Sequence, residues 1–123
     1  MKKITTISKE FTFDAAHNLV NYKGKCENLH GHTYRLRVTL MGTVDEKSGM
    51  IMDFGDLKSI VKERVVDRLD HNYLNNISPL STAENIIHWI WNEIEAPLKA
   101  ENRRLYEIVL WETATSFITL RAE

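Results

Sequence analysis

Two segments in the first third of the chain alternate apolar and polar residues, and each carries histidine at one end of its apolar row. In residues 4–17 the row consists of Phe11, Phe13, Ala15 and His17. In residues 30–43 it consists of His32, Tyr34, Leu36, Val38 and Leu40. A period of two places successive side chains on opposite faces of a β-strand. Both segments are therefore predicted to be strands of an antiparallel sheet with one buried face.

Two later segments change to a helical period. In residues 55–69 the apolar stripe consists of Leu57, Ile60, Val61, Val65 and Leu69,. The run Ser81-Thr82-Ala83-Glu84 has the form of a capping box,. It opens a second predicted helix that ends near Pro97, and its inward residues are Ala83, Ile86, Ile87, Ile90, Ile94 and Leu98. Residues 70–80 are expected to form the loop between the two helices.

Two further strands are predicted near the C-terminal end, over residues 104–113 and roughly 116–121. In the first of them Tyr106, Ile108, Leu110 and Glu112 share a face. The order β-β-α-α-β-β predicts an α+β fold, a four-stranded antiparallel sheet with two helices on one face. With 123 residues and no internal repeat or linker, we expect a single domain over residues 1–123,. Such a sheet leaves two open edges, and we expect a homo-oligomer that pairs them.

Composition narrows the partners that the chain could have. The formal net charge is −1, so no overall positive field favours nucleic acid,. No run approaches the roughly 18 apolar residues of a membrane span, and the basic residues 1–6 lack the apolar core of a signal peptide. A single cysteine is typical of a reducing compartment,. We therefore expect a cytoplasmic protein with no nucleic-acid or membrane partner.

The three histidines of the two strands form a candidate metal site. His30 and His32 lie two residues apart, so their side chains point the same way, roughly 6–7 Å apart along a strand. If the strands pair as a hairpin, His17 joins them at one end of the sheet. Three nitrogen ligands without a fourth protein ligand are typical of an open, catalytic zinc site. The alternative is that these are ordinary surface or core histidines, because a His-x-His pair is common.

Two other groups could carry proton chemistry. Cys26 lies in a lysine-rich segment, where nearby positive charges favour the thiolate and make it a plausible base,. It could instead be a small buried apolar residue or a fourth metal ligand. Asp70 and His71 follow the first predicted helix, where a charge pair can simply oppose the helix dipole. Alternatively, the carboxylate orients the imidazole for proton transfer.

Glu112 ends an apolar row, and an unpaired carboxylate on a buried face costs free energy. It could find a cationic partner within the protein. It could also await a ligand with two parallel N–H donors, such as the edge of a pterin ring. The basic residues that could contact an anionic substrate, or be solvated surface charges, are Lys23, Lys25, Arg35 and Arg37. His88 is interpreted as structural.

Five segments together resemble the family of 6-pyruvoyl-tetrahydropterin synthase and 6-carboxy-5,6,7,8-tetrahydropterin synthase. They are Phe13-Asp14-Ala15-Ala16-His17, Cys26-Glu27-Asn28-Leu29-His30-Gly31-His32, Leu69-Asp70-His71-Asn72-Tyr73-Leu74-Asn75, Ser81-Thr82-Ala83-Glu84-Asn85 and Trp111-Glu112-Thr113. They span nearly the whole chain in the family's order. The resemblance implies the tunnelling fold (T-fold), in which three subunits join their sheets into a barrel. Two barrels then stack as a homohexamer, a dimer of trimers.

The resemblance also assigns roles to these residues. It implies Zn²⁺ on His17, His30 and His32. It implies that Cys26 abstracts a proton and that Asp70 and His71, from a neighbouring subunit, form a proton relay. Glu112 would anchor the pterin ring. Two further residues match positions near the pterin pocket, Thr82 and Glu84.

The implied reaction is that of a lyase acting on the small molecule 7,8-dihydroneopterin triphosphate. In the carboxy branch the products are 6-carboxytetrahydropterin, acetaldehyde and triphosphate, on the route to queuosine and other 7-deazaguanines. In a folate branch that makes 6-hydroxymethyl-7,8-dihydropterin, a glutamate replaces the cysteine as base. This chain has both Cys26 and Glu27, which leaves folate-branch or dual activity open. The intact cysteine favours the carboxy reaction over the folate branch. The short length and compact loops look bacterial or archaeal, which disfavours the 6-pyruvoyl-tetrahydropterin reaction of animal relatives. A non-catalytic zinc- or pterin-binding protein is an alternative of a different class.

Overall fold

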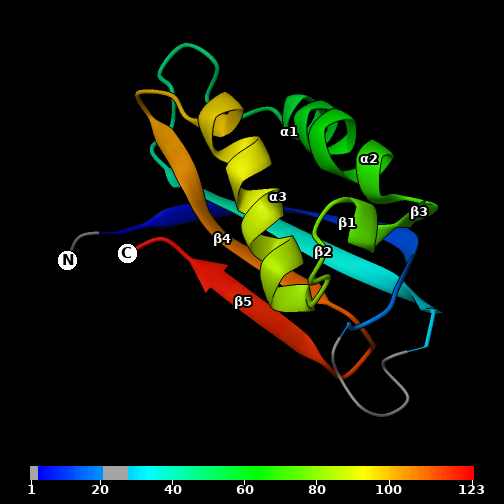
Figure 1. The fold of residues 1–123 in the computed structure, drawn as a ribbon. Coiled ribbons are helices and arrows are strands. Elements are labelled where there is room, and N and C mark those ends of the chain that lie inside the picture. Colours follow the sequence, from blue (N-terminus) through cyan, green and yellow to red (C-terminus); the bar gives the residue numbers. More distant parts are fainter. Residues whose placement is uncertain (1–2, 21–27) are drawn as a thin grey trace.

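The two strands predicted over residues 4–17 and 30–43 form the longest pair of strands in the sheet (Figure 1). The computed structural model describes residues 3–20 and 28–123. Strand β1 (Thr5–His17) pairs antiparallel with β2 (His30–Gly42) along its whole length. In this register His17 lies opposite His30, and Ala15 lies opposite His32. The alternating rows of the two strands therefore end side by side, with their histidines together.

The sheet has one strand more than the four predicted. Strand β4 (Arg103–Trp111) pairs antiparallel with β2, and β5 (Phe117–Arg121) pairs antiparallel with β4. The additional strand, β3 (Asn72–Tyr73), runs parallel to the end of β1 and completes the order β3-β1-β2-β4-β5. It lies in the segment expected to be a loop. Two residues are too few to show a period of two, so the sequence pattern could not predict this strand.

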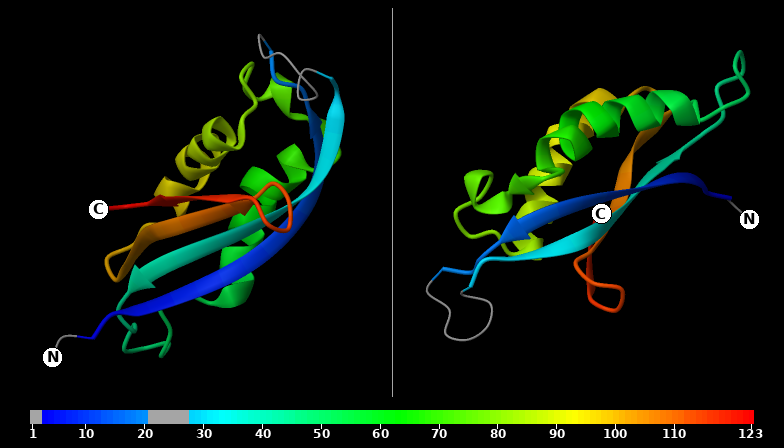
Figure 2. Two further views of the ribbon diagram at one scale, coloured as in Figure 1. Left: turned by 90° about the horizontal axis from the view of Figure 1, so that it is seen from below. Right: turned by 90° about the vertical axis from the view of Figure 1, so that its right-hand side faces the viewer.

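Both helices cover the same face of the sheet, as Figure 2 shows, so the α+β prediction is confirmed. Helix α1 (Phe54–Val61), the π-helical turn η2 (Lys62–Val66) and α2 (Asp67–Leu69) follow one another without a break. Together they occupy the predicted helix of residues 55–69. After the 3₁₀ turn η3 (Leu74–Asn76) comes the second helix, α3 (Ala83–Leu98). None of the helices in the described part of the chain is long and apolar enough to span a membrane.

The start of α3 differs by one residue from the predicted capping box. Thr82, and not Ser81, is the N-cap, and its side chain accepts a hydrogen bond from the backbone N–H of Asn85 at 3.2 Å. Ser81 is fully buried, and its hydroxyl donates to Asn75 at 2.8 Å. The hydroxyl of Ser81 is therefore engaged with the preceding turn, which leaves the cap to the next residue.

The core lies between the sheet and the two helices. The row of β2 from Tyr34 to Leu40 is fully buried and packs in one cluster with apolar residues of α1 and α3. His17, at the end of the β1 row, is also buried, with 2% of its surface exposed. The buried row of β1 therefore continues as far as His17, whereas His30 and His32 are partly exposed.

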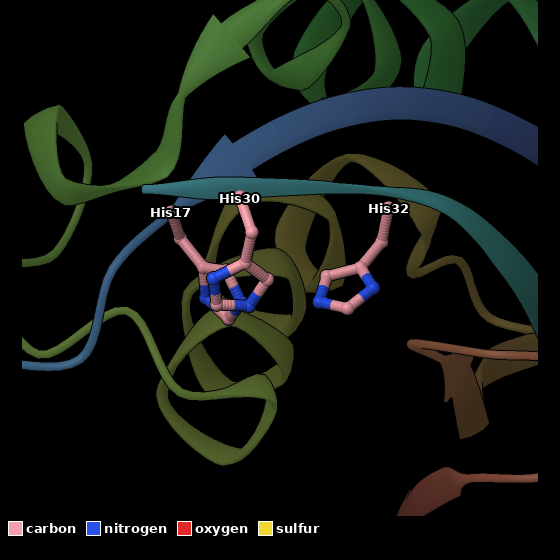
Figure 3. Close-up of side chains that lie close together, drawn as sticks. All are labelled: His17, His30 and His32. Atoms are coloured by element: carbon pink, nitrogen blue, oxygen red, sulfur yellow. The ribbon is translucent and has the colours of Figure 1, made fainter. Parts of the chain in front are cut away.

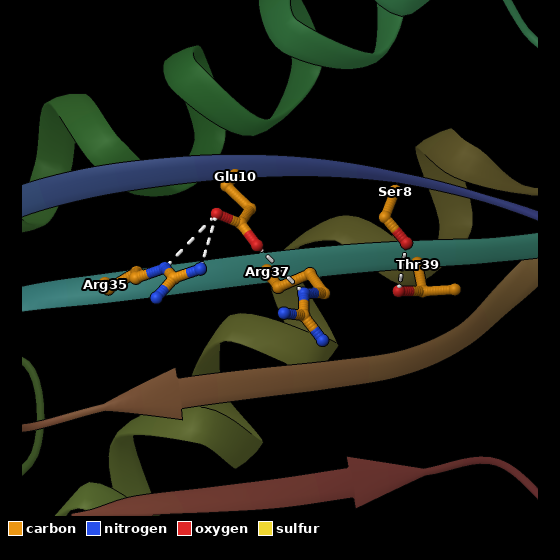
Figure 4. Close-up of polar contacts among 5 residues, drawn as sticks. All are labelled: Ser8, Glu10, Arg35, Arg37 and Thr39. Atoms are coloured by element: carbon orange, nitrogen blue, oxygen red, sulfur yellow. Dashed lines mark hydrogen bonds and ion pairs between the residues drawn. The ribbon is translucent and has the colours of Figure 1, made fainter. Parts of the chain in front are cut away.

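The helix-free face of the sheet carries paired polar side chains (Figure 4). The carboxylate of Glu10 accepts hydrogen bonds from Arg35 at 2.8 Å and Arg37 at 3.0 Å, and these two bonds lower its pKa. Both guanidinium groups also lie over the ring of Trp111, at 4.4 and 5.1 Å from its centroid,. Arg35 and Arg37 are thus bound to protein groups rather than being free surface charges.

Candidate functional site

The end of the β1–β2 ladder gathers three imidazole rings (Figure 3). The ring centroids of His17 and His30 lie 4.6 Å apart, those of His30 and His32 4.9 Å, and those of His17 and His32 5.2 Å. One nitrogen of each ring lies within 4.8 Å of the other two. The three histidines therefore form a cluster that could hold a metal ion.

Two of the rings are held by backbone carbonyls that determine their tautomer. Nδ1 of His17 is 2.8 Å from the carbonyl oxygen of Ser81, and Nδ1 of His30 is 2.8 Å from that of Asn28. A carbonyl can only accept a hydrogen bond, so in each ring Nδ1 carries the proton. In the neutral ring Nε2 then keeps its lone pair. Such outer partners are typical of histidines that ligate metals.

The free ring nitrogens fit the chemistry of a zinc ion. Nε2 of His17 and Nε2 of His32 are buried and have no hydrogen-bond partner within residues 3–20 and 28–123. A buried polar atom without a partner costs about 1–3 kcal/mol. A Zn²⁺ ion accepts imidazole nitrogens as ligands and would remove this cost. The donor set therefore fits a metal site with three protein ligands.

Glu112 lies at the rim of the histidine cluster, just beyond the end of β4. Its Oε1 is 3.5 Å from Nε2 of His32, which is too long for a hydrogen bond,. Burial lowers the pKa of His32, and the nearby charge of Glu112 opposes this only in part. The ring is therefore neutral at pH 7, and the contact is not a salt bridge. The backbone N–H of Glu112 donates to Ser116 at 3.0 Å, which fixes the residue in the β4–β5 turn.

Asp70 and His71 form a contact pair held against the edge of β1. Nδ1 of His71 lies 3.0 Å from the carboxylate of Asp70. The backbone of Asp14 anchors both residues: its N–H donates to Asp70 at 2.9 Å, and its carbonyl accepts from His71 N–H at 2.6 Å. The Asp14 N–H, with a smaller effect of His71, lowers the pKa of Asp70. Asp70 is thus ionised at neutral pH and can orient the imidazole.

His71 has an unusual backbone conformation. Its φ is 56°, in the left-handed region that non-glycine residues rarely adopt,. Strained residues of this kind cluster at active sites and ligand-binding sites. The side chain is largely exposed, at 80%. Helix α2 has already ended at its extended C-cap Asp70, and the imidazole of His71 lies in solvent.

The Asp70–His71 pair and the histidine cluster lie on different sides of β1 and β2. The carboxylate of Asp14 lies with Asp70 and His71, and it faces away from Ala15 and the buried row because side chains alternate along a strand,. A pocket of about 560 Å³ adjoins His71 and Tyr73 there, and His32 is the one member of the cluster on its wall. Within one chain, the pair does not join the free nitrogens of the cluster.

The other predicted site residues either lie on α3 or fall outside the part of the chain that the structure describes. Thr82 caps α3, and Glu84 is exposed in the first turn of that helix. Cys26 and Glu27 lie outside the described residues, as do Lys23 and Lys25. His88 is exposed on α3, and its Nδ1 lies 2.9 Å from the carbonyl oxygen of Glu84.

The sequence did not reveal the residues whose backbone groups bond to the candidate site residues and hold them in place. Asp14 holds the Asp70–His71 pair through its backbone, while Ser81 orients His17 through its carbonyl. Backbone contacts leave no side-chain pattern in a sequence. Asn75, which binds Ser81, offered one weak signal, because a polar residue between two predicted helices often bonds to nearby backbone,.

Comparison with known proteins adds independent information. The model of the family described as 6-pyruvoyl tetrahydropterin synthase matches residues 6–123. A 6-carboxy-5,6,7,8-tetrahydropterin synthase of Haemophilus influenzae is 40% identical, and the match covers 90% of this chain and 94% of that protein. A 6-pyruvoyl tetrahydrobiopterin synthase of Dictyostelium discoideum is 36% identical, with full coverage of both chains.

A solved structure agrees with the fold. The 6-pyruvoyl tetrahydropterin synthase of Caenorhabditis elegans superposes with a TM-score of 0.83 at 29% sequence identity. The match covers 98% of this chain and 97% of that one. The expected T-fold is thereby confirmed for the single chain.

Proposed function

Because the chain belongs to the 6-pyruvoyl tetrahydropterin synthase family, we propose that it is a zinc-dependent 6-carboxy-5,6,7,8-tetrahydropterin synthase. Its substrate would be 7,8-dihydroneopterin triphosphate, and its product would enter queuosine biosynthesis. The observation that carries this proposal is the cluster of three imidazoles with free, buried nitrogens beside the carboxylate of Glu112. The name of the Haemophilus relative supports the carboxy product.

His17, His30 and His32 would hold the zinc ion through the nitrogens that face one another. The ion would supply Lewis acidity toward the hydroxyl groups of the substrate's side chain. The protein contributes the fixed tautomers described above, which keep the ligating lone pairs available. The buried position of His17 limits competing water.

Cys26 would remove a proton from the substrate's side chain as the thiolate. His71 would exchange protons with the substrate, oriented by the ionised carboxylate of Asp70 at 3.0 Å,. Loss of triphosphate would accompany internal reduction of the pterin ring, so no external hydride donor is required. Addition of water, with cleavage of the bond between the first and second side-chain carbons, would then leave the 6-carboxyl group and release acetaldehyde.

Glu112 would bind the pterin ring. Its carboxylate can accept two parallel hydrogen bonds from the ring's amino group and neighbouring N–H. Its position beside His32 supports this role, because it would place the substrate's side chain next to the metal. Thr82 and Glu84, at the start of α3, would lie near this pocket.

We further propose a cytoplasmic homohexamer built from two trimers. β3 covers the outer edge of β1 only at Ala15 and Ala16, and β5 is the opposite edge of the sheet. Open edges of this kind can pair between subunits. Because Asp70 and His71 lie away from the free nitrogens of their own chain, a neighbouring subunit would supply them to each site. A reducing cytoplasm would keep Cys26 as a free thiol.

A second product has support from the sequence. Cys26 and Glu27 are adjacent, and each is a candidate base. If Glu27 acts in place of Cys26, the product is 6-hydroxymethyl-7,8-dihydropterin, as in the folate branch of the family. The 6-pyruvoyl product, for which the Dictyostelium relative is named, is the third possibility.

Product identification tests these alternatives. Zinc-loaded protein is incubated with 7,8-dihydroneopterin triphosphate, and products are separated and identified by mass. Acetaldehyde together with 6-carboxytetrahydropterin supports the proposal, and Cys26→Ala should abolish both. Formation of 6-hydroxymethyl-dihydropterin that is lost in Glu27→Ala assigns the folate branch instead. No product from zinc-loaded protein would refute the enzyme and leave a zinc- or pterin-binding protein.

A further inference from the structure

Three polar residues from separate segments form a hydrogen-bonded group directly behind His17. Asn18 follows β1, Asn75 lies in η3, and Ser81 precedes α3. We propose that Asn75 is a positioning residue for His17 and, through it, for the metal ion. This inference rests on the zinc centre of the proposed function and extends it to a residue outside the ligand set.

The side-chain amide of Asn75 makes every hydrogen bond available to it. Its Oδ1 accepts from the backbone N–H of Asn18 at 3.1 Å and from the hydroxyl of Ser81 at 2.8 Å. Its Nδ2 donates to the carbonyls of Asn18 at 2.9 Å and Pro79 at 3.2 Å. An asparagine amide has two donors and two acceptor lone pairs. One orientation of Asn75 therefore satisfies all four partners and holds three segments together.

Ser81 connects this group to the metal site. Its hydroxyl is bonded to Asn75, and its carbonyl is bonded to Nδ1 of His17 at 2.8 Å. Ser81 is fully buried, so water cannot replace either contact. Asn75 thus determines where the carbonyl lies, and the carbonyl determines the orientation and tautomer of the His17 ring.

Asn75 also belongs to the segment that carries Asp70 and His71. Asp70 and His71 bond to the backbone of Asp14 within β1, and Asn75 bonds to Asn18 just after the end of the strand. The same segment would therefore supply Asp70 and His71 to the site of a neighbouring subunit and support His17 at the metal site of its own chain.

A matched control lies at the opposite end of β2. The side-chain amide of Asn102 donates to the carbonyls of Thr43 at 2.8 Å and Ile51 at 3.2 Å. These bonds connect a turn to its neighbours and do not reach the histidine cluster. Asn102→Ala therefore measures the loss of stability that follows when any asparagine amide bonded to backbone carbonyls is removed.

Zinc affinity provides the test, because it is read without turnover. Competition with a chromophoric chelator gives the Kd of the wild type, Asn75→Ala, Asn75→Asp and Asn102→Ala. In Asn75→Asp, one carboxylate oxygen can still accept the bonds made to Oδ1. The other oxygen replaces the amide nitrogen and cannot donate to the carbonyls of Asn18 and Pro79. We expect both Asn75 variants to bind zinc about 10- to 100-fold more weakly. Asn102→Ala should retain the affinity of the wild type, even where its melting temperature falls as far as that of Asn75→Ala.

Each other outcome counts against a particular claim. Wild-type affinity in folded Asn75→Ala overturns the positioning role while leaving the proposed enzyme intact. A wild-type protein that binds no zinc overturns the metal centre and this inference together. If Asn75→Ala does not fold, Ser81→Ala decides, since it removes the hydroxyl link and keeps the carbonyl. Its zinc affinity should fall, and unchanged affinity would reject the proposal.

Discussion

At the scale of single residues, the candidate metal site depends on which ring nitrogens of the three histidines have no hydrogen-bond partner. The histidine cluster has buried nitrogens without hydrogen-bond partners in the described part of the chain, while the opposite nitrogens of His17 and His30 are held by carbonyls. The parity of the residues predicted the cluster from sequence. The carbonyl partner of His17 could not be predicted, because Ser81 lies 64 positions from His17 and contributes only backbone.

His32→Ala is expected to remove the metal, because two imidazoles remain where the site needs three. Zinc per protomer, measured by elemental analysis after dialysis, should fall to background. His88→Ala is the matched control, since this imidazole is exposed on α3 and its Nδ1 lies 2.9 Å from the backbone carbonyl oxygen of Glu84. It should keep the full zinc content. Full zinc content in His32→Ala would remove this residue from the ligand set.

Asp70→Asn is expected to make stability less dependent on pH in the acid range. The pKa of Asp70 is lowered in the folded protein, chiefly by the N–H of Asp14. Its contribution to stability is therefore present above the unfolded pKa of about 3.9 and is lost as the pH falls through the folded pKa. Melting temperatures of the two proteins should differ at pH 6, and the difference should shrink as the pH falls below the unfolded pKa and through the folded one.

Asp67→Asn serves as the control for that measurement. Its carboxylate is also exposed and pairs with Lys62 at 2.9 Å, but it binds no backbone N–H among the described residues. A difference between wild type and Asp70→Asn that stays constant from pH 6 to pH 2.5 would contradict the assigned cause.

At the scale of elements, periodicity predicted most of the fold. The strands and helices begin and end within about two residues of the predicted positions, because each buries a long apolar row or stripe,. The features that the sequence did not predict each involve only one or two residues. Strand β3 has two residues, and the cap of α3 shifted because the Ser81 hydroxyl binds Asn75. Such features depend on tertiary neighbours, which a local pattern does not contain.

The close approach of β2 to β4 predicts a difference between two glycines of β2. A Cβ at Gly42 would lie 2.2 Å from the carbonyl oxygen of Asn102 and 2.9 Å from Cα of Arg103. Gly42→Ala is therefore expected to lower the free energy of unfolding by about 1–3 kcal/mol, as overpacking does. Denaturation by urea measures this change.

Gly31→Ala is the comparison within the same strand. Its nearest contact would be the Ala15 carbonyl oxygen at 3.5 Å, an ordinary van der Waals distance. We expect stability close to that of the wild type and retention of zinc, although the residue lies between His30 and His32. Equal losses of stability in the two variants would show that strand position, and not the steric contact, determines the cost.

At the scale of the whole molecule, the Asp70–His71 pair and the histidine cluster lie apart within one chain, and the proposed function joins them by assembly of subunits. Light scattering after size-exclusion chromatography should give a mass about six times the 14.3 kDa of one chain,. A monomer at the concentrations used for assay would contradict the proposed sharing of sites between subunits.

Mixed oligomers test that sharing directly. Cys26→Ala and His71→Ala should each be inactive alone. Co-expressed in equal amounts, they should regain activity at about a quarter of the sites, where an intact cysteine meets an intact histidine from another chain. Zinc content should be normal in both variants. No recovery in verified mixed oligomers would place Cys26 and His71 of one site on the same chain.

The β1–β2 ladder also limits how relatives of this chain can diverge in length. Every residue from Thr5 to His17 has a partner on β2. Removing one residue between Phe13 and His17 would turn His17 to the opposite face, because the side-chain period is two. The strand that ends at His17 must therefore keep its number of residues if the three histidines are to stay together.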